Sequence, residues 1–170
     1  MTIPVPFETD FTIKPKEQAF IEKVEDLFVK IFGIPRIGGR ILGLLLVSPQ
    51  PLTIEKISKC LFVSHSSVST NLRLLILFGL VQKVTFIGER CDFYQFSSHA
   101  WDRIHQRSIE MIQELRDLTS AGLDDLPPAG IVHQRMDDMA VWSNLVFAMV
   151  NEASKAWHEY WLIRNFSNSL

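Results

Sequence analysis

The sequence lacks the features that mark disulfide-bonded, secreted or membrane-spanning proteins. Its two cysteines, Cys60 and Cys91, provide no disulfide framework and match no zinc-binding spacing. The longest apolar run, Ile41–Val47, is far shorter than the roughly 18 residues that a membrane span requires. The first residues lack the basic start and apolar centre of a secretory signal. These absences predict a cytoplasmic, reduced protein with no membrane partner.

Motifs of catalysis are absent as well. The sequence contains no Gly-rich phosphate loop, no nucleophile elbow and no HExxH helix. His99, Asp102 and His105 have a spacing that is found in some metal sensors, but the two histidines point to different sides of a helix. A metal site there would need a ligand from a second subunit. We therefore expect no enzyme, no cofactor and no metal, and a capping or surface role for these three residues.

The chain has little net charge, but its charge is unevenly distributed. The formal net charge is −2 at pH 7. Between Lys30 and Arg90 there are eight basic residues and only two acidic ones, Glu55 and Glu89. This segment is therefore positive, and the rest of the chain is strongly negative. Because phosphate binding depends on the local field, the segment permits contact with nucleic acid without proving it.

The pattern of apolar residues and breakers predicts a mainly α-helical protein. Proline and glycine bound the first helix, whereas Thr53, Ser64 and Ser98 are expected to cap the N-termini of later helices. Two β-rich runs around "IGER" predict a hairpin. The expected helices are Pro15–Gly33, Pro35–Val47, Ile54–Leu61, Ser64–Gly79, a long helix after Ser98, and one or two helices over Ile131–Asn165. Helices followed by a turn, a helix and a hairpin form the order of a winged helix-turn-helix.

The segment "SHSSVSTNLR" fits this fold as a recognition helix. At 100° per residue, Val68, Leu72 and Leu75 share one face, which is expected to pack on the preceding helices. Short hydroxyl side chains occupy the other side, where they allow close approach to a major groove and can hydrogen-bond bases or phosphates. The predicted DNA contacts are Ser64, Ser66, Ser67, Ser69, Thr70, Asn71 and Arg73.

Five sequence blocks resemble the GbsR/MarR-type winged helix-turn-helix transcriptional regulators. They are a "GIPRIGGRILGLL" block, a "PLT" helix start, an "SVSTNLR" helix, a "GLV" turn and a "GERCDFY" wing. In order, the blocks are Gly33–Leu45, Pro51–Thr53, Ser67–Arg73, Gly79–Val81 and Gly88–Tyr94. The resemblance covers roughly residues 33–97, and the flanking helices agree with the family only in length and helical character.

This resemblance implies a homodimeric, repressor-like regulator that binds a pseudo-palindromic operator in double-stranded DNA. It implies an N-terminal arm (1–14), a dimerisation helix (15–33), a DNA-binding domain (34–98) and a C-terminal helical region (99–170) for dimerisation and effector binding. The wing residue Arg90 would lie in or beside the minor groove, where its positive charge is favoured. Some members of the family sense choline or a related compound, which implies a possible small-molecule effector.

Two departures from the family pattern leave another function open. The run Leu74–Phe78 is wholly apolar, so part of it is expected to meet another helix or a partner protein. Cys91 stands where a basic wing residue is expected, which weakens the predicted contacts between wing and phosphate. The alternative hypothesis is therefore a winged helix that serves protein assembly without binding DNA.

Two groups of side chains also keep more than one interpretation. Arg36 and Arg40 could clamp phosphates, or they could pair with acidic residues elsewhere in the chain. The aromatic residues near the C-terminus could form a cage for a choline-like cation, a pocket for an apolar molecule, or a packed core or dimer interface. The tentative effector residues are Trp142, Trp157, Tyr160 and Trp161.

Overall fold

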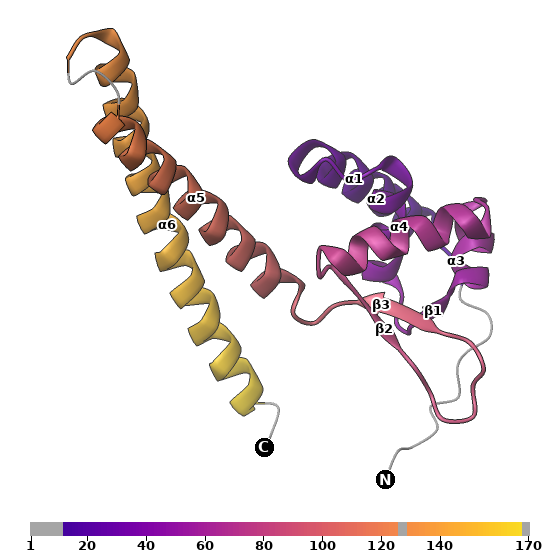
Figure 1. Cartoon of the computed structure of the whole chain (residues 1–170). Helices are drawn as coiled ribbons and strands as arrows, with labels where there is room; N and C mark the ends of the chain where they lie inside the picture. The colour runs from indigo at the N-terminus through magenta and orange to yellow at the C-terminus, as the bar shows by residue number, and fades with distance from the viewer. Residues whose placement is uncertain (1–11, 126–128, 168–170) are drawn as a thin grey trace. The chain divides into compact units, whose positions relative to one another are not determined.

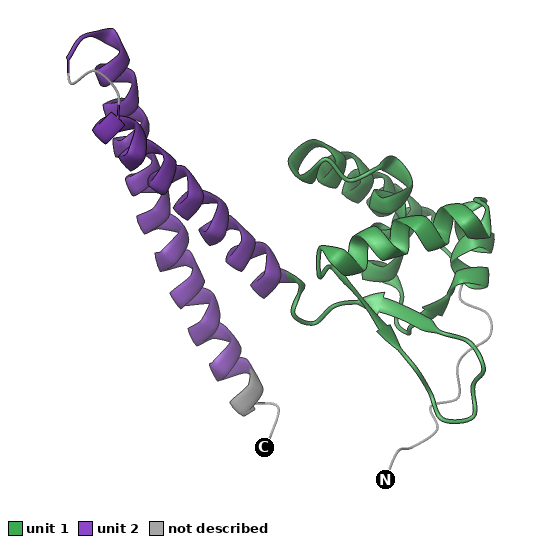
Figure 2. Ribbon diagram, in the orientation of Figure 1, with its two compact units in different colours: residues 1–100 green, residues 101–170 purple. Residues whose placement is uncertain are grey.

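The computed structural model describes residues 12–125 and 129–167 of the chain. The chain divides into two compact units, residues 1–100 and residues 101–170 (Figure 2). Most of the predicted N-terminal arm, residues 1–11, lies outside the described residues.

The first unit combines four helices with a small antiparallel sheet (Figure 1). The sheet has the strand order β1-β3-β2, with Leu52 opposite Tyr94 and Val81 opposite Phe96. This arrangement confirms the expected winged helix-turn-helix and adds a two-residue strand that the sequence pattern does not predict. The elements are α1 (Pro15–Phe32), α2 (Arg36–Val47), β1 (Leu52–Thr53), α3 (Ile54–Leu61), α4 (His65–Leu77), β2 (Val81–Val84) and β3 (Phe93–Phe96).

Most helix ends lie where the capping residues predict. Gly33 ends α1 in the left-handed conformation, with φ 63°. The Thr53 hydroxyl accepts a hydrogen bond from the Lys56 amide at 3.2 Å and caps α3. The expected cap at Ser98 is wrong: the helix after the wing starts at Ala100, and the Ser97 hydroxyl accepts from the His99 amide instead.

Helices α1 and α2 pack with their backbones in contact because two glycines face α1. A Cβ atom added to Gly39 would lie 2.9 Å from the Cα of Glu25. A Cβ added to Gly43 would lie 2.9 Å from the Cα of Ile21, one helical turn earlier. These glycines therefore serve close helix packing, as the sequence suggests, and they hold α1 against the DNA-binding core.

The turn between α3 and α4 brings the two helices to an angle of 111°, which is typical of a helix-turn-helix. Phe62 ends α3 in the left-handed region, with φ 55° and ψ 46°. The Ser64 hydroxyl then accepts from the Ser67 amide at 3.2 Å and caps α4. Both ends of the turn are thus fixed by local hydrogen bonds.

The second unit is an antiparallel hairpin of α5 (Ala100–Asp125) and α6 (Ile131–Ser167). Of the two possibilities for the C-terminal segment, the structure shows one continuous helix of 37 residues. Arg116 Nε donates to Asn144 Oδ1 at 2.7 Å, and Trp157 Nε1 donates to Asp102 Oδ1 at 2.7 Å. These two pairs connect the helices in opposite directions of the chain and fix the antiparallel register.

Within the described ranges, no single helix is long and apolar enough to cross a membrane. Among the same residues, the bent pair of α3 and α4 reaches the required length and hydropathy only when its two helices are taken together.

Candidate nucleic-acid interface

Helix α4 buries one face in the core of the first unit. Val68 and Leu75 are fully buried, and Leu72 is 1% exposed. Their spacing of four and three residues places them on one stripe of the helix. The structure therefore confirms the face that the sequence predicts to pack on the preceding helices.

The opposite face of α4 is polar and open to solvent. Ser66, Thr70 and Arg73 are exposed, and Ser69 is half-buried. Arg73 Nη2 donates to the Ser69 hydroxyl at 3.3 Å, so the guanidinium lies along the helix surface. The Ser64 and Ser66 hydroxyls share a hydrogen bond of 3.1 Å at the first turn. This face offers hydroxyl groups and one cation, without acidic residues in its first turn.

Asn71 is an exception among the predicted contacts, because the structure buries it. Its side chain is 8% exposed, and its Nδ2 donates to the Ser67 carbonyl at 2.9 Å. Its Oδ1 faces α2, where a Cβ on Gly38 would lie 3.1 Å away. Buried in this way, Asn71 cannot reach a groove, and we remove it from the candidate DNA contacts. It acts between α4 and α2 instead.

His65 is an exposed residue that is missing from the predicted contact set. It is the first residue of α4 and therefore lies beside the serines of the first turn. It also lines a hollow of about 220 Å³ with Thr53 and Glu55 of α3 and Cys91 and Tyr94 of the wing region. Its place in the first turn is the sequence signal that could have identified it.

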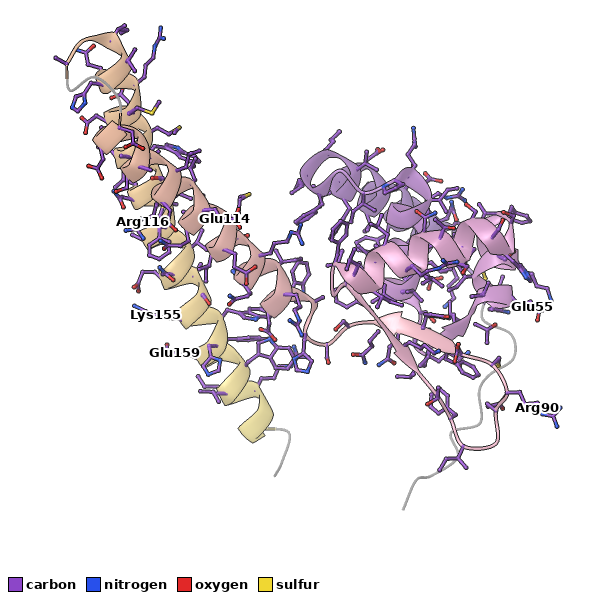
Figure 3. All side chains as sticks on the ribbon, in the orientation of Figure 1. Glu55, Arg90, Glu114, Arg116, Lys155 and Glu159 are labelled. Atoms are coloured by element: carbon purple, nitrogen blue, oxygen red, sulfur yellow. The ribbon has the colours of Figure 1, made fainter. Side chains whose placement is uncertain are left out.

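The wing is a short hairpin whose loop is anchored by an aromatic pair. The Phe86 ring packs edge-on against the Phe93 ring, with 5.0 Å between centroids. The Glu89 amide donates to the Phe86 carbonyl at 3.2 Å, and Gly88 takes a positive φ of 92°. Arg90 follows this turn, is exposed, and extends away from the sheet (Figure 3).

The wing also carries an ion pair across its two strands. Lys83 Nζ lies 2.7 Å from Asp92 Oδ2. The hydrogen bond to Asp92 raises the pKa of Lys83, and burial raises the pKa of the neighbouring Tyr94. Asp92 therefore neutralises one wing cation and leaves Arg90 as the exposed cation of the loop.

Arg36 and Arg40 converge on one buried carboxylate. Arg36 Nε lies 2.6 Å from Glu25 Oε1, and Arg40 Nε lies 4.0 Å from Glu25 Oε2. The hydrogen bond and charge of Glu25 raise the pKa of Arg36. Arg40 Nη2 also donates to the Leu61 carbonyl at 3.1 Å. Of the two interpretations left open, this geometry favours pairing with an acid over a phosphate clamp.

The apolar run Leu74–Phe78 is divided between core and surface. Leu75 is fully buried, whereas Ile76 is 38% exposed and Leu77 is 77% exposed. Leu74 and Phe78 are half-buried. The run therefore supplies only part of its side chains to the core of its own unit, as expected.

The four aromatic residues proposed for an effector do not form one group. Trp157 stacks on Tyr160 at 5.6 Å between centroids and meets Trp161 edge-on at 5.9 Å. Trp142 lies 15 residues earlier on the same continuous helix, which is about 22 Å away at 1.5 Å per residue. Within one chain Trp142 cannot share a cage with the others, and that part of the prediction is wrong.

Among the described residues, no group of three or more His, Cys, Asp or Glu side chains is placed to hold a metal ion. Asp102 accepts a hydrogen bond from Trp157, and the His105 ring lies 6.2 Å from the Trp157 ring. These two members of the histidine spacing therefore contact the aromatic residues of α6.

The fold and the α4 surface together define a winged helix-turn-helix DNA-binding protein. No protein-family model matches the chain. The HTH-type transcriptional regulator MmpR5 of Mycobacterium tuberculosis is 30% identical over 151 residues, which cover 86% of this chain and 88% of that protein. The HTH-type transcriptional repressor OpcR of Bacillus subtilis is 30% identical over 82 residues, or 48% of this chain and 44% of that repressor.

A crystal structure of a transcriptional regulator matches 85% of this chain and 99% of its own, with a TM-score of 0.67 and 28% identity. The chain therefore belongs to the HTH-type transcriptional regulators and is a DNA-binding protein that regulates transcription. This confirms the resemblance drawn from the sequence at the level of a winged-helix regulator, and it decides against a module used for protein assembly alone.

Proposed function

We propose that the protein represses transcription as a homodimer that inserts one α4 helix of each subunit into successive major grooves. The observation that carries this proposal is the division of α4 into a buried apolar face and an exposed hydroxyl face ending in Arg73. Such a helix can approach base edges closely while remaining fixed to its core. The proposed contacts are Ser64, Ser66, Ser67, Ser69, Thr70 and Arg73, with His65 added from the structure.

Arg90 supplies the second contact of each subunit. It follows an anchored turn and is exposed, so its guanidinium can lie along a minor groove while α4 occupies the adjacent major groove. A wing contact of this kind adds phosphate affinity and responds to groove width. Arg36, by contrast, is held by Glu25 and is left out of the proposed contacts.

Exposed apolar stripes on α1 and on the α5–α6 hairpin support the homodimer. Val141, Leu145 and Met149 repeat every four residues on α6 and are 54%, 62% and 71% exposed. Phe20 and Leu27 form a similar stripe on α1, 47% and 51% exposed. Large exposed apolar patches of this kind mark interaction surfaces. We assign residues 15–33 and 99–170 to dimerisation, and residues 34–98 to DNA binding.

A dimer of this kind sets the form of the operator. Two equal subunits require two similar half-sites whose centres lie about one helical turn of DNA apart, or a multiple of it. The test is selection of binding sites from a random DNA pool by the purified protein, with light scattering of the free and bound forms. Inverted repeats bound by two subunits support the proposal; enrichment of no sequence contradicts it.

Mutation of the α6 stripe tests the dimer separately. Leu145→Asp places a charge in the apolar stripe and is expected to produce monomers in light scattering. Glu152→Gln, at an exposed position of the same helix that pairs with Lys155, is the matched control and should leave the mass unchanged. A monomeric wild-type protein that still binds inverted repeats tightly would contradict the assignment.

The small-molecule effector stays a prediction. Trp157, Tyr160 and Trp161 pack on one another, and the Arg164 guanidinium carbon lies 5.6 Å from the Trp161 ring centroid. An aromatic face that already attracts a cation of the chain is a reasonable place to test a cationic ligand. Titration of choline should quench tryptophan fluorescence and release DNA if this cluster binds it. An unchanged spectrum and an unchanged DNA affinity at millimolar choline would exclude this effector class.

A further inference from the structure

The end of α3 is held by a side chain from another helix. Arg40 of α2 donates from Nη2 to the carbonyl oxygen of Leu61, the last residue of α3, at 3.1 Å. The last carbonyl groups of an α-helix have no partner within the helix and attract cations. Arg40 therefore satisfies a group at the point where α3 stops.

This point is the hinge between α3 and the recognition helix. Phe62 takes the left-handed conformation directly after Leu61, the Val63 amide donates to the Ser58 carbonyl at 3.2 Å, and Ser64 caps α4. The direction in which α4 leaves the turn therefore depends on the position of the last turn of α3. A shift of the Leu61 carbonyl would rotate the DNA-reading face.

Arg40 is itself held by α1. Its Nε lies 4.0 Å from Oε2 of Glu25, whose side chain is 8% exposed. The Glu25 backbone is in contact with Gly39, so the carboxylate has little freedom to move relative to α2. The chain of contacts runs from α1 through Glu25 and Arg40 to the hinge of the helix-turn-helix.

We propose that Arg40 is a positioning residue for DNA recognition: anchored by Glu25, it fixes the α3–α4 hinge and thereby the orientation of α4. This inference rests on the proposed function of α4 as the DNA-reading helix. It assigns a role in operator affinity to Glu25, a buried residue of α1 that does not itself contact DNA. Because the apolar stripe of α1 is part of the proposed dimer surface, the relay also couples dimer contacts to the reading helix.

A positioning role and a phosphate contact make different predictions. Each phosphate contact that is lost reduces the slope of log affinity against log salt by about 0.9, because fewer counterions are released. The side chain of Arg40 is 30% exposed and directed at a carbonyl, so its loss should lower operator affinity without changing that slope. Arg36 lies on the same carboxylate but is 77% exposed and makes no described contact with Leu61.

The experiment compares the full-length wild type with Arg40→Met, Glu25→Gln, the double variant, and Arg36→Met as the matched control. The probe is a duplex selected by the wild-type protein from a random pool, titrated over a salt series. We expect Arg40→Met and Glu25→Gln each to lower operator affinity about tenfold, which is the scale of one charged hydrogen bond. The double variant should equal the single variants, and Arg36→Met should stay within about twofold of wild type.

Amide exchange provides a readout beyond affinity. In Arg40→Met the amides of residues 62 and 63 should exchange faster, whereas those of Arg36→Met should not. Thermal unfolding shows whether the variants are folded. If Arg40→Met does not fold, Glu25→Gln, which retains both arginines, carries the same test.

Three results would overturn the inference. Full operator affinity in Arg40→Met and Glu25→Gln would show that the hinge does not need the relay. A salt slope reduced by about 0.9 in Arg40→Met would identify a direct phosphate contact instead. Additive losses in the double variant would separate Glu25 from Arg40. If the wild type selects no duplex at all, the proposed function fails, and that failure is visible before any variant is made.

Discussion

Replacing Phe62 with glycine should stabilise the protein, because Phe62 is held in a conformation that suits glycine. Its φ is 55° and its ψ is 46°, within the left-handed helical region. Its side chain is 93% exposed, so the ring buries almost no apolar surface that the change would remove. The substitution therefore relieves backbone strain at the helix-turn-helix hinge without opening a cavity.

The expected gain follows from two opposing terms. The left-handed conformation costs a residue with a Cβ about 1–2 kcal/mol. Glycine loses about 0.5–1 kcal/mol more backbone entropy than other residues on folding. The free energy of unfolding of Phe62→Gly should therefore rise by about 0.5–1 kcal/mol. In a protein of this size that corresponds to an increase in Tm of about 2 °C.

Phe62→Ala is the matched control, because alanine removes the ring and keeps the strain. Its free energy of unfolding should stay within about 0.5 kcal/mol of wild type, as at most exposed positions. Urea unfolding followed by circular dichroism measures all three proteins at one temperature. Since glycine preserves the turn, operator affinity should change by less than about twofold in Phe62→Gly. A glycine variant no more stable than the alanine variant would refute the strain argument.

Three further changes test other contacts of the first unit. Gly43→Ala should lower the free energy of unfolding by about 1–3 kcal/mol in urea unfolding, since its Cβ would lie 2.9 Å from the Ile21 Cα, and an unchanged midpoint would contradict the backbone contact. Ser64→Ala removes the acceptor of the Ser67 amide and should cost about 1 kcal/mol, whereas Ser64→Gly should cost only a few tenths; equal losses would contradict capping. Leu77→Ser changes a side chain that is 77% exposed, so it should alter the free energy of unfolding by less than about 0.5 kcal/mol, and a changed oligomer mass in light scattering would reveal a partner surface there.

Features that depend on neighbours in the chain are predicted well from the sequence. Gly33, Thr53 and Ser64 end or begin helices where expected, because their effect requires only a few adjacent residues. The buried stripe of Val68 and Leu72 follows directly from helical periodicity. These local rules are sufficient to locate the recognition helix and its exposed face from the sequence alone.

Features that depend on distant residues are not predicted. The strand Leu52–Thr53 is too short to carry a pattern of its own and exists because Phe93 and Tyr94 pair with it. The convergence of two arginines on Glu25 requires α1 and α2 to pack at their glycines, which the sequence suggests without giving the register.

Asn71 is an intermediate case. Helical geometry places it about 40° from Leu75, at the edge of the buried face, so its burial could have been inferred from position. Its amide chemistry, which suits base recognition, favours the opposite prediction. The sequence groups Trp142 with Trp157 because it leaves open whether their segment is one helix or two, and the continuous helix α6 separates them.

The salt dependence of operator binding by wild type and Arg73→Ala tests the central claim most directly. Arg73 is exposed on the hydroxyl face of α4, so its loss in a dimer removes one cation from each half-site. If both contact phosphates, the slope of log affinity against log salt should fall by about 1.8, and the affinity for the selected duplex should drop with it. Full affinity of Arg73→Ala at every salt concentration would show that this face of α4 does not bind DNA.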